Sequence, residues 1–358
     1  MPTLVHLLRE SARHFPRCPA VLGETISLDH ATFGVLSDRV ATGLLARGVR
    51  TGDRVGLYAP NGPEFALAYA GILKAGASVV PINLLIGHEE AAYILSDSGA
   101  RGLIAHAALR EPAALLPQAA PNLEWVVELG GGLEVTANLA ALLGAEAIPP
   151  EPVLEPDEAL AAILYTSGTT GFPKGAMLTH ANLAANVHSV HQAMRWRAGE
   201  DRVLVVLPMF HAFAATVGLL TPLTNGCALI PLPRFEPEAV AEAVQTWQAT
   251  IFLGVPSMYS VLLRLRPERT GLLASLRFGI VGGAAMPVSV MQAFETRFGV
   301  PLYEGDGPTE CSPVTCVNPI GGLAKLHVAA GKLAEAKALI ETAPPAAPGR
   351  EQDPALVA

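Results

Sequence analysis

From residue 54 onward, short β-rich runs alternate with helical patterns along the chain. This alternation is typical of α/β proteins, in which mainly parallel sheets are layered with helices on both faces. Proline stands near the start of three helical patterns, at Pro63, Pro237 and Pro287, and Gly76 and Gly299 are expected to end two helices. We predict strands over the following ranges: Arg54–Tyr58, Ser78–Ile82, Arg101–Ala105, Trp125–Leu129, Ala161–Thr166, Arg202–Leu207, Ala228–Pro231, Thr250–Val255 and Leu276–Val281.

Composition excludes several classes of protein. The chain has 358 residues, of which 51% are hydrophobic and 16% charged, so it is not a disordered polymer and has enough length for a large core. A net charge of −8 leaves no broad basic face, so we expect no nucleic acid partner. The 4 cysteines form no C-x-x-C pair, which favours a reducing, cytoplasmic compartment.

Apolar stretches are too short to predict membrane insertion. The longest, Ala212–Leu223, falls short of the ~20 residues that a membrane-spanning helix needs. Arg9 and Glu10 interrupt what would have to be the apolar part of a signal peptide. We therefore expect no transmembrane segment and no export, and leave peripheral membrane contact and a homodimer open.

The segment Tyr165–Gly175 has the composition of a phosphate-binding loop. It follows the buried-strand pattern Ala161–Leu164 and precedes a helix expected to start near Thr179. Glycines let backbone N–H groups approach an anion, hydroxyls add donors, and Lys174 adds a cation. Pro173 stands where a Walker A loop has its second glycine, which argues against a P-loop NTPase. A flexible surface loop is the alternative interpretation of these residues alone.

Together with Leu178–Leu183, this segment resembles the signature of the adenylate-forming superfamily of acyl-CoA synthetases, luciferases and peptide-synthetase adenylation domains. The resemblance covers about residues 1–322 and is strongest to bacterial medium- and long-chain fatty acyl-CoA ligases. It implies the large N-terminal domain of such an enzyme, without its last part and the small C-terminal domain. Further segments resemble family motifs in the same order: Pro208–Phe213, Gly254–Tyr259, Val281–Pro287 and Tyr303–Val314.

The resemblance implies ATP, Mg²⁺ and CoA as cofactors or co-substrates and a fatty acid as substrate. Because the carboxylate substrate supplies the nucleophile, the protein has only to hold charge and align groups. Each CH₂ buried in an acyl channel adds ~0.8 kcal/mol, which favours a long chain over acetate.

The implied catalytic residues are Lys174, Thr309, Glu310 and His211, with Thr166 and Glu310 as metal ligands. The implied acyl pocket comprises Phe210, His211, Phe213, Val255 and Pro313. The implied ATP site comprises Thr166, Ser167, Gly168, Thr169, Thr170, Gly171, Lys174, Gly282, Gly283, Ala284, Glu304, Gly305, Asp306, Gly307 and Thr309.

Two departures from the family pattern stand out. Asp306 replaces the aromatic residue that usually stacks on adenine, so the source of stacking is open. Leu323–Ala358 lacks the Thr-Gly-Asp motif and the C-terminal lysine of the family, and is Ala- and Pro-rich instead. A shifted reading frame or a truncated gene would explain this change. We expect an incomplete AMP-binding domain over 1–322, a loosely ordered tail over 323–358 and impaired activity; the alternative is a non-catalytic remnant that binds nucleotide or acyl chains weakly.

Overall fold

The computed structural model describes residues 1–24, 26–130, 139–140, 142–144, 147–166, 171–318 and 320. The chain divides into two compact units, Met1–Val317 and Asn318–Ala358, and the described residues lie almost wholly in the first. The tail expected over 323–358 lies outside the described residues.

One sheet has 8 strands in the order β14-β13-β12-β11-β9-β10-β1-β2. All its neighbouring strands run parallel except at the two edges, where β2 and β14 are antiparallel to their partners. Its strands are β1 (Pro19–Leu22), β2 (Ser27–Asp29), β9 (Arg202–Val205), β10 (Ala228–Pro231), β11 (Ile251–Gly254), β12 (Phe278–Val281), β13 (Leu302–Asp306) and β14 (Cys316–Val317). Strands β10, β11 and β12 are buried at every position, as expected for central strands covered on both faces.

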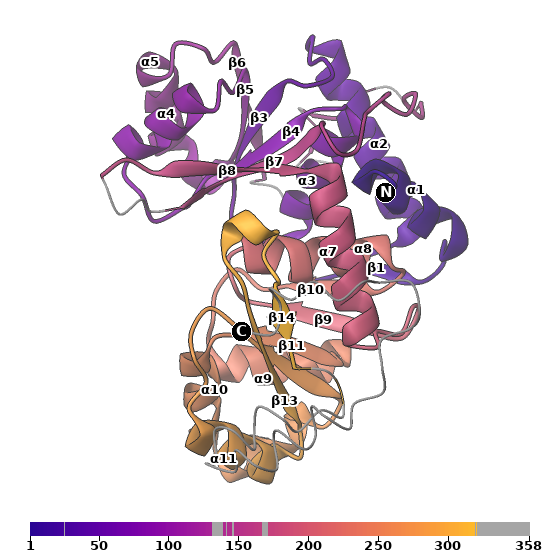
Figure 1. The fold of residues 1–358 in the computed structure, drawn as a ribbon, viewed down its shortest axis with the longest axis vertical. Helices are drawn as coiled ribbons and strands as arrows, with labels where there is room; N and C mark the ends of the chain where they lie inside the picture. Colours follow the sequence, from indigo (N-terminus) through magenta and orange to yellow (C-terminus); the bar gives the residue numbers. More distant parts are fainter. Residues whose placement is uncertain are drawn as a thin grey trace, which may run out of the picture. The chain divides into compact units, whose positions relative to one another are not determined.

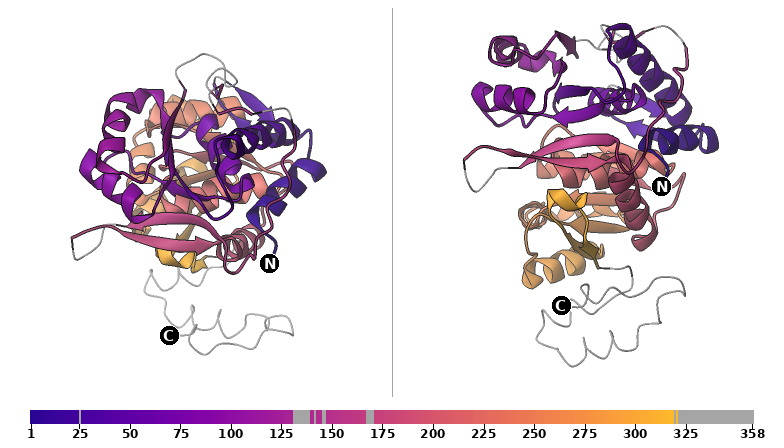
Figure 2. Two further views of the ribbon diagram at one scale, coloured as in Figure 1. Left: turned by 90° about the horizontal axis from the view of Figure 1, so that it is seen from above. Right: turned by 45° about the horizontal axis from the view of Figure 1, so that its top comes forward.

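The second sheet has 6 strands in the order β6-β5-β3-β4-β7-β8. Its strands are β3 (Arg54–Tyr58), β4 (Ser78–Pro81), β5 (Gly102–His106), β6 (Trp125–Leu129), β7 (Leu160–Thr166) and β8 (Lys174–Thr179). Only β8 is antiparallel, because it returns from β7 as a hairpin and forms the edge of the sheet (Figure 2).

Helices lie between the sheets and on their outer faces (Figure 1). The inner group, which packs together and against both sheets, is α1 (Leu4–His14), α2 (His30–Ala46), α3 (Pro63–Lys74), α7 (His180–Ala193), the π-helix η2 (Ala214–Leu220) and α8 (Thr221–Thr224). Beside the six-stranded sheet lie α4 (His88–Asp97), η1 (Ala107–Leu109) and α5 (Arg110–Ala119). Beside the eight-stranded sheet lie α9 (Pro237–Trp247), α10 (Pro256–Leu262), η3 (Pro267–Leu273) and α11 (Val288–Phe298), and η4 (Thr309–Cys311) packs on β8.

Local sequence signals account for many helix ends. Pro63 and Pro237 occupy the first position of their helices, and Pro287 caps α11. Gly299 ends α11 with φ 68°, a left-handed conformation that glycine adopts without steric cost. Helix α7 begins with a capping box, in which Thr179 and Asn182 each satisfy the other's backbone N–H. This box fixes the point where the chain passes from β8 into α7.

The structure confirms the predicted α/β class, and every predicted strand is present with ends that differ by at most two residues. The sequence interpretation missed five strands: β1, β2, β8, β13 and β14. In the described part of the chain, no helix combines the length and apolar character needed to cross a bilayer. The apolar stretch Ala212–Leu223 instead forms η2 and most of α8, which are buried.

Asn61 joins the two sheets beside the ends of their strands. Its side-chain NH₂ group donates to the carbonyl oxygens of Leu207 at 2.9 Å and Leu232 at 3.0 Å. Its side-chain oxygen accepts the backbone N–H of Met209 at 2.8 Å. A loop that follows β3 in one sheet is therefore hydrogen-bonded to the segments that follow β9 and β10 in the other.

Candidate active site

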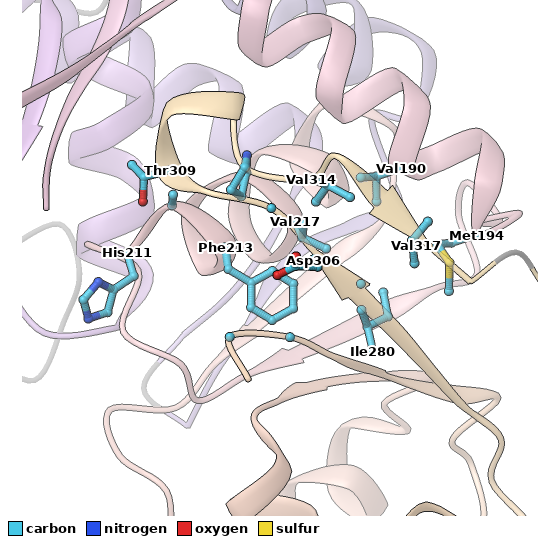
Figure 3. Close-up of a pocket in the computed structure, with 16 residues that line it drawn as sticks. Val190, Met194, His211, Phe213, Val217, Ile280, Asp306, Thr309, Val314 and Val317 are labelled. Atoms are coloured by element: carbon cyan, nitrogen blue, oxygen red, sulfur yellow. The ribbon is translucent and has the colours of Figure 1, made fainter. Parts of the chain in front are cut away.

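Two cavities meet at the carboxyl ends of the strands, where α/β proteins commonly bind ligands. The first, here called the apolar cavity, has a volume of about 200 Å³ and lies between α7, η2 and the strands β12, β13 and β14 (Figure 3). It is lined mainly by aliphatic side chains and by glycine backbone: Val190, Met194, His211, Ala212, Phe213, Val217, Ile280, Gly282, Gly283, Gly305, Asp306, Gly307, Thr309, Pro313, Val314 and Val317.

The second, here called the polar cavity, has a volume of about 290 Å³ and lies between α4 and the end of β7. Its lining contains hydroxyl, amide and carboxylate groups: Pro81, Asn83, Ile86, Glu90, Ile94, Leu164, Tyr165, Thr166, Pro173, Phe210, His211, Ala212 and Thr309. The two cavities share His211, Ala212 and Thr309. A ligand with a polar and an apolar part has room for one part on each side of this junction.

His211 stands at the junction with its side chain exposed, and its ring lies 4.5 Å from the ring of Phe210. Desolvation by the surrounding groups lowers the pKa of His211 below its usual value. The imidazole is therefore neutral near pH 7, so it contributes hydrogen bonding and shape to the junction rather than a positive charge.

The β7–β8 hairpin places a hydroxyl and a cation opposite each other. Thr166 at the end of β7 is the register partner of Lys174 at the start of β8. Lys174 is exposed, and β8 packs against η4, which carries Thr309 and Glu310. The structure thus brings together residues that lie more than a hundred positions apart in the sequence. Four other predicted phosphate-binding residues lie outside the described residues: Ser167, Gly168, Thr169 and Thr170.

Helix α4 anchors this hairpin on both sides of its tip. The Tyr165 hydroxyl donates to the Asp97 carboxylate at 2.6 Å. Beyond the tip, the ring of Phe172 lies 5.0 Å from the ring of Tyr93. Desolvation and the neighbouring carboxylate raise the pKa of Tyr165, which keeps its proton available for this hydrogen bond. Two residues one helical turn apart, Tyr93 and Asp97, therefore hold the two ends of the predicted phosphate loop.

The turn after β12 lies against an aromatic ring. A Cβ atom added at Gly282 would stand 3.0 Å from Phe213, so the Phe213 ring rests directly on this glycine. Val255 lies behind the neighbouring Gly283. The carboxylate of Glu304 accepts the backbone N–H of Met286 at 3.1 Å and so ties β13 to this turn.

The segment 306–317 folds into a tight turn beside the apolar cavity. A Cβ atom at Gly307 would stand 1.6 Å from the carbonyl oxygen of Pro313, so only glycine fits there. The Thr315 N–H and hydroxyl both donate to the Asp306 carbonyl, at 2.9 Å each. From α7, the Asn186 side chain donates to the Val314 carbonyl at 2.8 Å and accepts the Val314 N–H at 3.3 Å. Asn186 thus clamps this wall of the cavity to α7.

The family model described as "AMP-binding enzyme" matches residues 8–342. The chain belongs to this family. Among curated relatives, it is 35% identical over 318 residues to feruloyl-CoA synthase from Amycolatopsis sp, covering 89% of this chain and 60% of that protein. It is 30% identical over 355 residues to a long-chain-fatty-acid–CoA ligase from Bacillus subtilis, covering 89% and 62%.

A solved structure of an AMP-binding relative shares the fold. The inhibitor-bound N-terminal domain of FACL13 from Mycobacterium tuberculosis matches with a TM-score of 0.81 and 28% identity, over 91% of this chain and 81% of that one. The chain spans about 60% of the length of the curated relatives named above. The family and the fold of an N-terminal adenylate-forming domain, expected from the motifs, are therefore confirmed.

In this AMP-binding fold, the predicted site residues separate into groups. Of the predicted acyl pocket, Phe213, His211 and Pro313 line the apolar cavity, whereas Phe210 lines the polar cavity. Several predicted ATP-site residues line the apolar cavity: Gly282, Gly283, Gly305, Asp306, Gly307 and Thr309. Thr166 lines the polar cavity, and the described residues that line either cavity do not include Val255, Ala284, Glu304, Glu310, Gly171 or Lys174.

Sequence reasoning missed the residues that close the apolar cavity. Val190 lies on α7 and Met194 caps its C-terminus one turn later, and their four-residue spacing could have placed them on one face. Asn186 lies one turn before Val190 and continues that face. Ile280 was missed because buried aliphatic residues of central strands look alike whether or not they border a ligand. Val314 and Val317 lie in and beside the short edge strand β14, which the sequence analysis did not predict.

The side chains around the hairpin could hold Mg²⁺ only together with phosphate oxygens of a bound nucleotide. Among the residues that the structure describes, no three His, Cys, Asp or Glu side chains gather as a metal site. Mg²⁺ in proteins is commonly held by one or two carboxylates together with substrate phosphates and water. Thr166 and Glu310, on elements that pack around β8, offer one hydroxyl and one carboxylate of this kind.

Proposed function

We propose that this chain activates a carboxylic acid with ATP. A carboxylate oxygen of the acid attacks the α-phosphorus, the bond to the β-phosphate bridge breaks, and pyrophosphate leaves to give an acyl-adenylate. The thiol of CoA, after losing its proton, then attacks the acyl carbon, and AMP leaves with the electron pair. The single observation that carries this proposal is the meeting of an apolar and a polar cavity at Thr309 and His211.

Each part of the site has a task in this reaction. Lys174 and the predicted loop bind the β- and γ-phosphates, which neutralises the charge of the leaving pyrophosphate. Thr309, at the junction, donates to the α-phosphate, and Thr166 and Glu310 would hold Mg²⁺. That ion supplies charge neutralisation of the phosphate oxygens when it is bound. Neutral His211 orients the acid's carboxylate without attracting it away from phosphorus.

We propose a fatty acid as the substrate. Its support is the aliphatic lining of the apolar cavity, from Phe213 to Met194, in which Asp306 is the one charged side chain among the described residues. Burial of each methylene there contributes ~0.8 kcal/mol. The relatives named above include a feruloyl-CoA synthase and a long-chain-fatty-acid–CoA ligase, so similarity to them does not select one acid. The proposal of a fatty acid therefore rests on the lining of the apolar cavity.

A second candidate function is binding of nucleotide or acyl-adenylate without turnover. Its support is that the matching FACL13 structure is an N-terminal domain with an inhibitor bound. In that case the cavities would hold ligand, and no product would form.

One experiment separates these candidates. The protein is incubated with ATP, Mg²⁺, dodecanoate and hydroxylamine, and hydroxamate and pyrophosphate are measured beside calorimetric titration with a non-hydrolysable dodecanoyl-sulfamoyl-adenosine. Product above that of a Lys174→Ala control supports adenylation. Tight binding of the analogue without product supports the second candidate, and neither product nor binding overturns both.

A further inference from the structure

The apolar cavity runs from an exposed residue at one end to a buried residue at the other. Figure 3 shows His211 and Thr309 at one side, and Met194 and Val317 at the opposite side, with Phe213, Val217 and Val314 between them. At one side His211 is exposed, and at the other Met194 is 0% exposed; between them Val217 is 1% exposed and Asp306 is exposed, and Val317 beside Met194 is half-buried. The cavity therefore has an exposed mouth at the junction with the polar cavity, and its far end is formed by the buried Met194.

Met194 occupies the far end of the cavity because α7 ends beside it. It follows the last residue of α7, and its N–H donates to the Val190 carbonyl at 3.0 Å. The next residue, Arg195, has φ 45°, so the chain leaves the helix axis directly after Met194. The capping contacts of Met194 come from its backbone, so its side chain can be changed without removing them.

The position of α7 beside the cavity is itself fixed at one point. Asn186, two turns before Met194, makes two hydrogen bonds to the backbone of Val314 on the opposite wall. Asn186, Val190 and Met194 follow each other at four-residue intervals, so they share one face of the helix. A change at Met194 therefore alters the end of the cavity while the clamp keeps the walls in place.

We propose that Met194 determines the length of acid that this chain accepts, with Val190 and Val317 forming the wall beside it. This inference rests on the proposed function and deepens it. An acyl chain that enters at His211 runs past Phe213 and Val217 and ends against the Met194 thioether. Because methionine is unbranched and adapts to irregular space, the natural residue accepts a range of lengths, whereas a rigid ring at this position sets a sharp limit.

The test uses the full 358-residue chain and non-hydrolysable octanoyl-, dodecanoyl- and palmitoyl-sulfamoyl-adenosines, titrated by calorimetry. Each buried methylene is worth about fourfold in affinity. Met194→Ala should raise the ratio of palmitoyl to octanoyl affinity by at least about tenfold, since the shortened side chain leaves room for two or more methylenes. Met194→Phe should lower the same ratio by at least about tenfold.

Met291→Ala is the matched control. Met291 is a buried methionine of α11 that is 4% exposed and is not among the described residues that line either cavity, so its loss should destabilise the fold and leave the ratio unchanged. Equal ratios in Met194→Phe, Met194→Ala and Met291→Ala would overturn the inference while leaving the proposed function intact. If Met194→Ala does not fold, Met194→Phe decides alone. Failure of the wild-type chain to bind any analogue would overturn the proposed function, and the inference with it.

Discussion

The apolar and polar cavities share three residues but are built in opposite ways. The apolar cavity is enclosed by a central sheet and by two inner helices whose residues belong to the core. The polar cavity is bordered by an edge hairpin through Tyr165, Thr166 and Pro173, and the same hairpin carries the exposed Lys174 beside the cavity. Core packing therefore sets the shape of the first, and exposed charge sets the chemistry of the second. Substitutions in the two regions should consequently separate stability from nucleotide binding.

The largest expected effect concerns the hairpin. Lys174→Ala should lower the rate of adenylation by ~10²–10³, since it removes one preorganised positive charge from the leaving pyrophosphate. The melting temperature should stay unchanged, because Lys174 is exposed. Met177→Ala, at an exposed position of the same strand, should change neither quantity. Wild-type turnover in the Lys174→Ala protein would show that this hairpin is not part of the active site.

Acidification should weaken the inner helices rather than the hairpin. His30 and His180 are each 1% exposed, and burial lowers the pKa of both from 6.5 to about 4. The unfolded chain binds the proton more tightly, so stability is complete above pH 6.5 and is lost as pH falls toward 4. The loss is on the order of 3 kcal/mol for each histidine.

Denaturant unfolding at a series of pH values measures this loss. In the fold, His180 accepts the Leu4 N–H through Nδ1, and His30 contacts Ser11 and the Cys227 carbonyl. His180→Asn and His30→Asn should each flatten the dependence of unfolding free energy on pH between 6.5 and 4. A variant that keeps the full wild-type slope would show that its histidine does not carry the effect.

The clamp between α7 and the cavity wall should matter for both stability and binding. Asn186→Ala leaves the N–H and carbonyl of Val314 without their partner, which costs about 1–3 kcal/mol. Affinity for a dodecanoyl-sulfamoyl-adenosine should fall with it, and the Val314 amide should exchange its hydrogen faster. Asn182→Ala, on the same helix but exposed at the third position of the capping box, removes one capping hydrogen bond and should leave Val314 exchange unchanged. Equal Val314 exchange in the two variants would contradict a clamp.

The smallest effect concerns the anchor of the hairpin. Tyr165→Phe removes the hydrogen bond to Asp97 and should cost about 0.5–1.5 kcal/mol in ATP affinity, since the loop must then be ordered on binding. Calorimetric titration with ATP and Mg²⁺ measures it. Loss of the same affinity in a Tyr93→Phe protein, which keeps the ring contact with Phe172, would show that the hydroxyl of Tyr165 is not the cause.

Sequence patterns predicted the layered α/β fold because each element carries a local signal. Buried runs such as Ala228–Pro231 and proline at the first turn of α3 and α9 need no long-range information. Three of the missed strands lie at sheet edges: β2, β8 and β14. Of these, β14 has 2 residues, and β8 contains a glycine and a lysine that resemble a loop. The other two, β1 and β13, lie inside the sheet but have only 4 and 5 residues. Edge strands are short and polar by necessity, which hides them from a search for buried runs.

Motifs point to residues at the junction more readily than to residues of the cavity beyond it. Thr166, His211 and Thr309 belong to recognisable sequence motifs, and all three line the polar cavity. Met194 and Val317 belong to no motif. They line the apolar cavity because of where α7 ends and where β14 pairs with β13. A position that closes a cavity is defined by tertiary packing, which local sequence does not encode.

The most direct measurement is a crystal structure of this chain with dodecanoyl-sulfamoyl-adenosine bound. We expect the sulfamoyl group between Thr166, His211 and Thr309, and the acyl chain along Phe213 with its end against Met194. An acyl chain found elsewhere, for example in the separate cleft lined by Asn61, His106 and Trp247, would contradict the assignment of the apolar cavity to the acid.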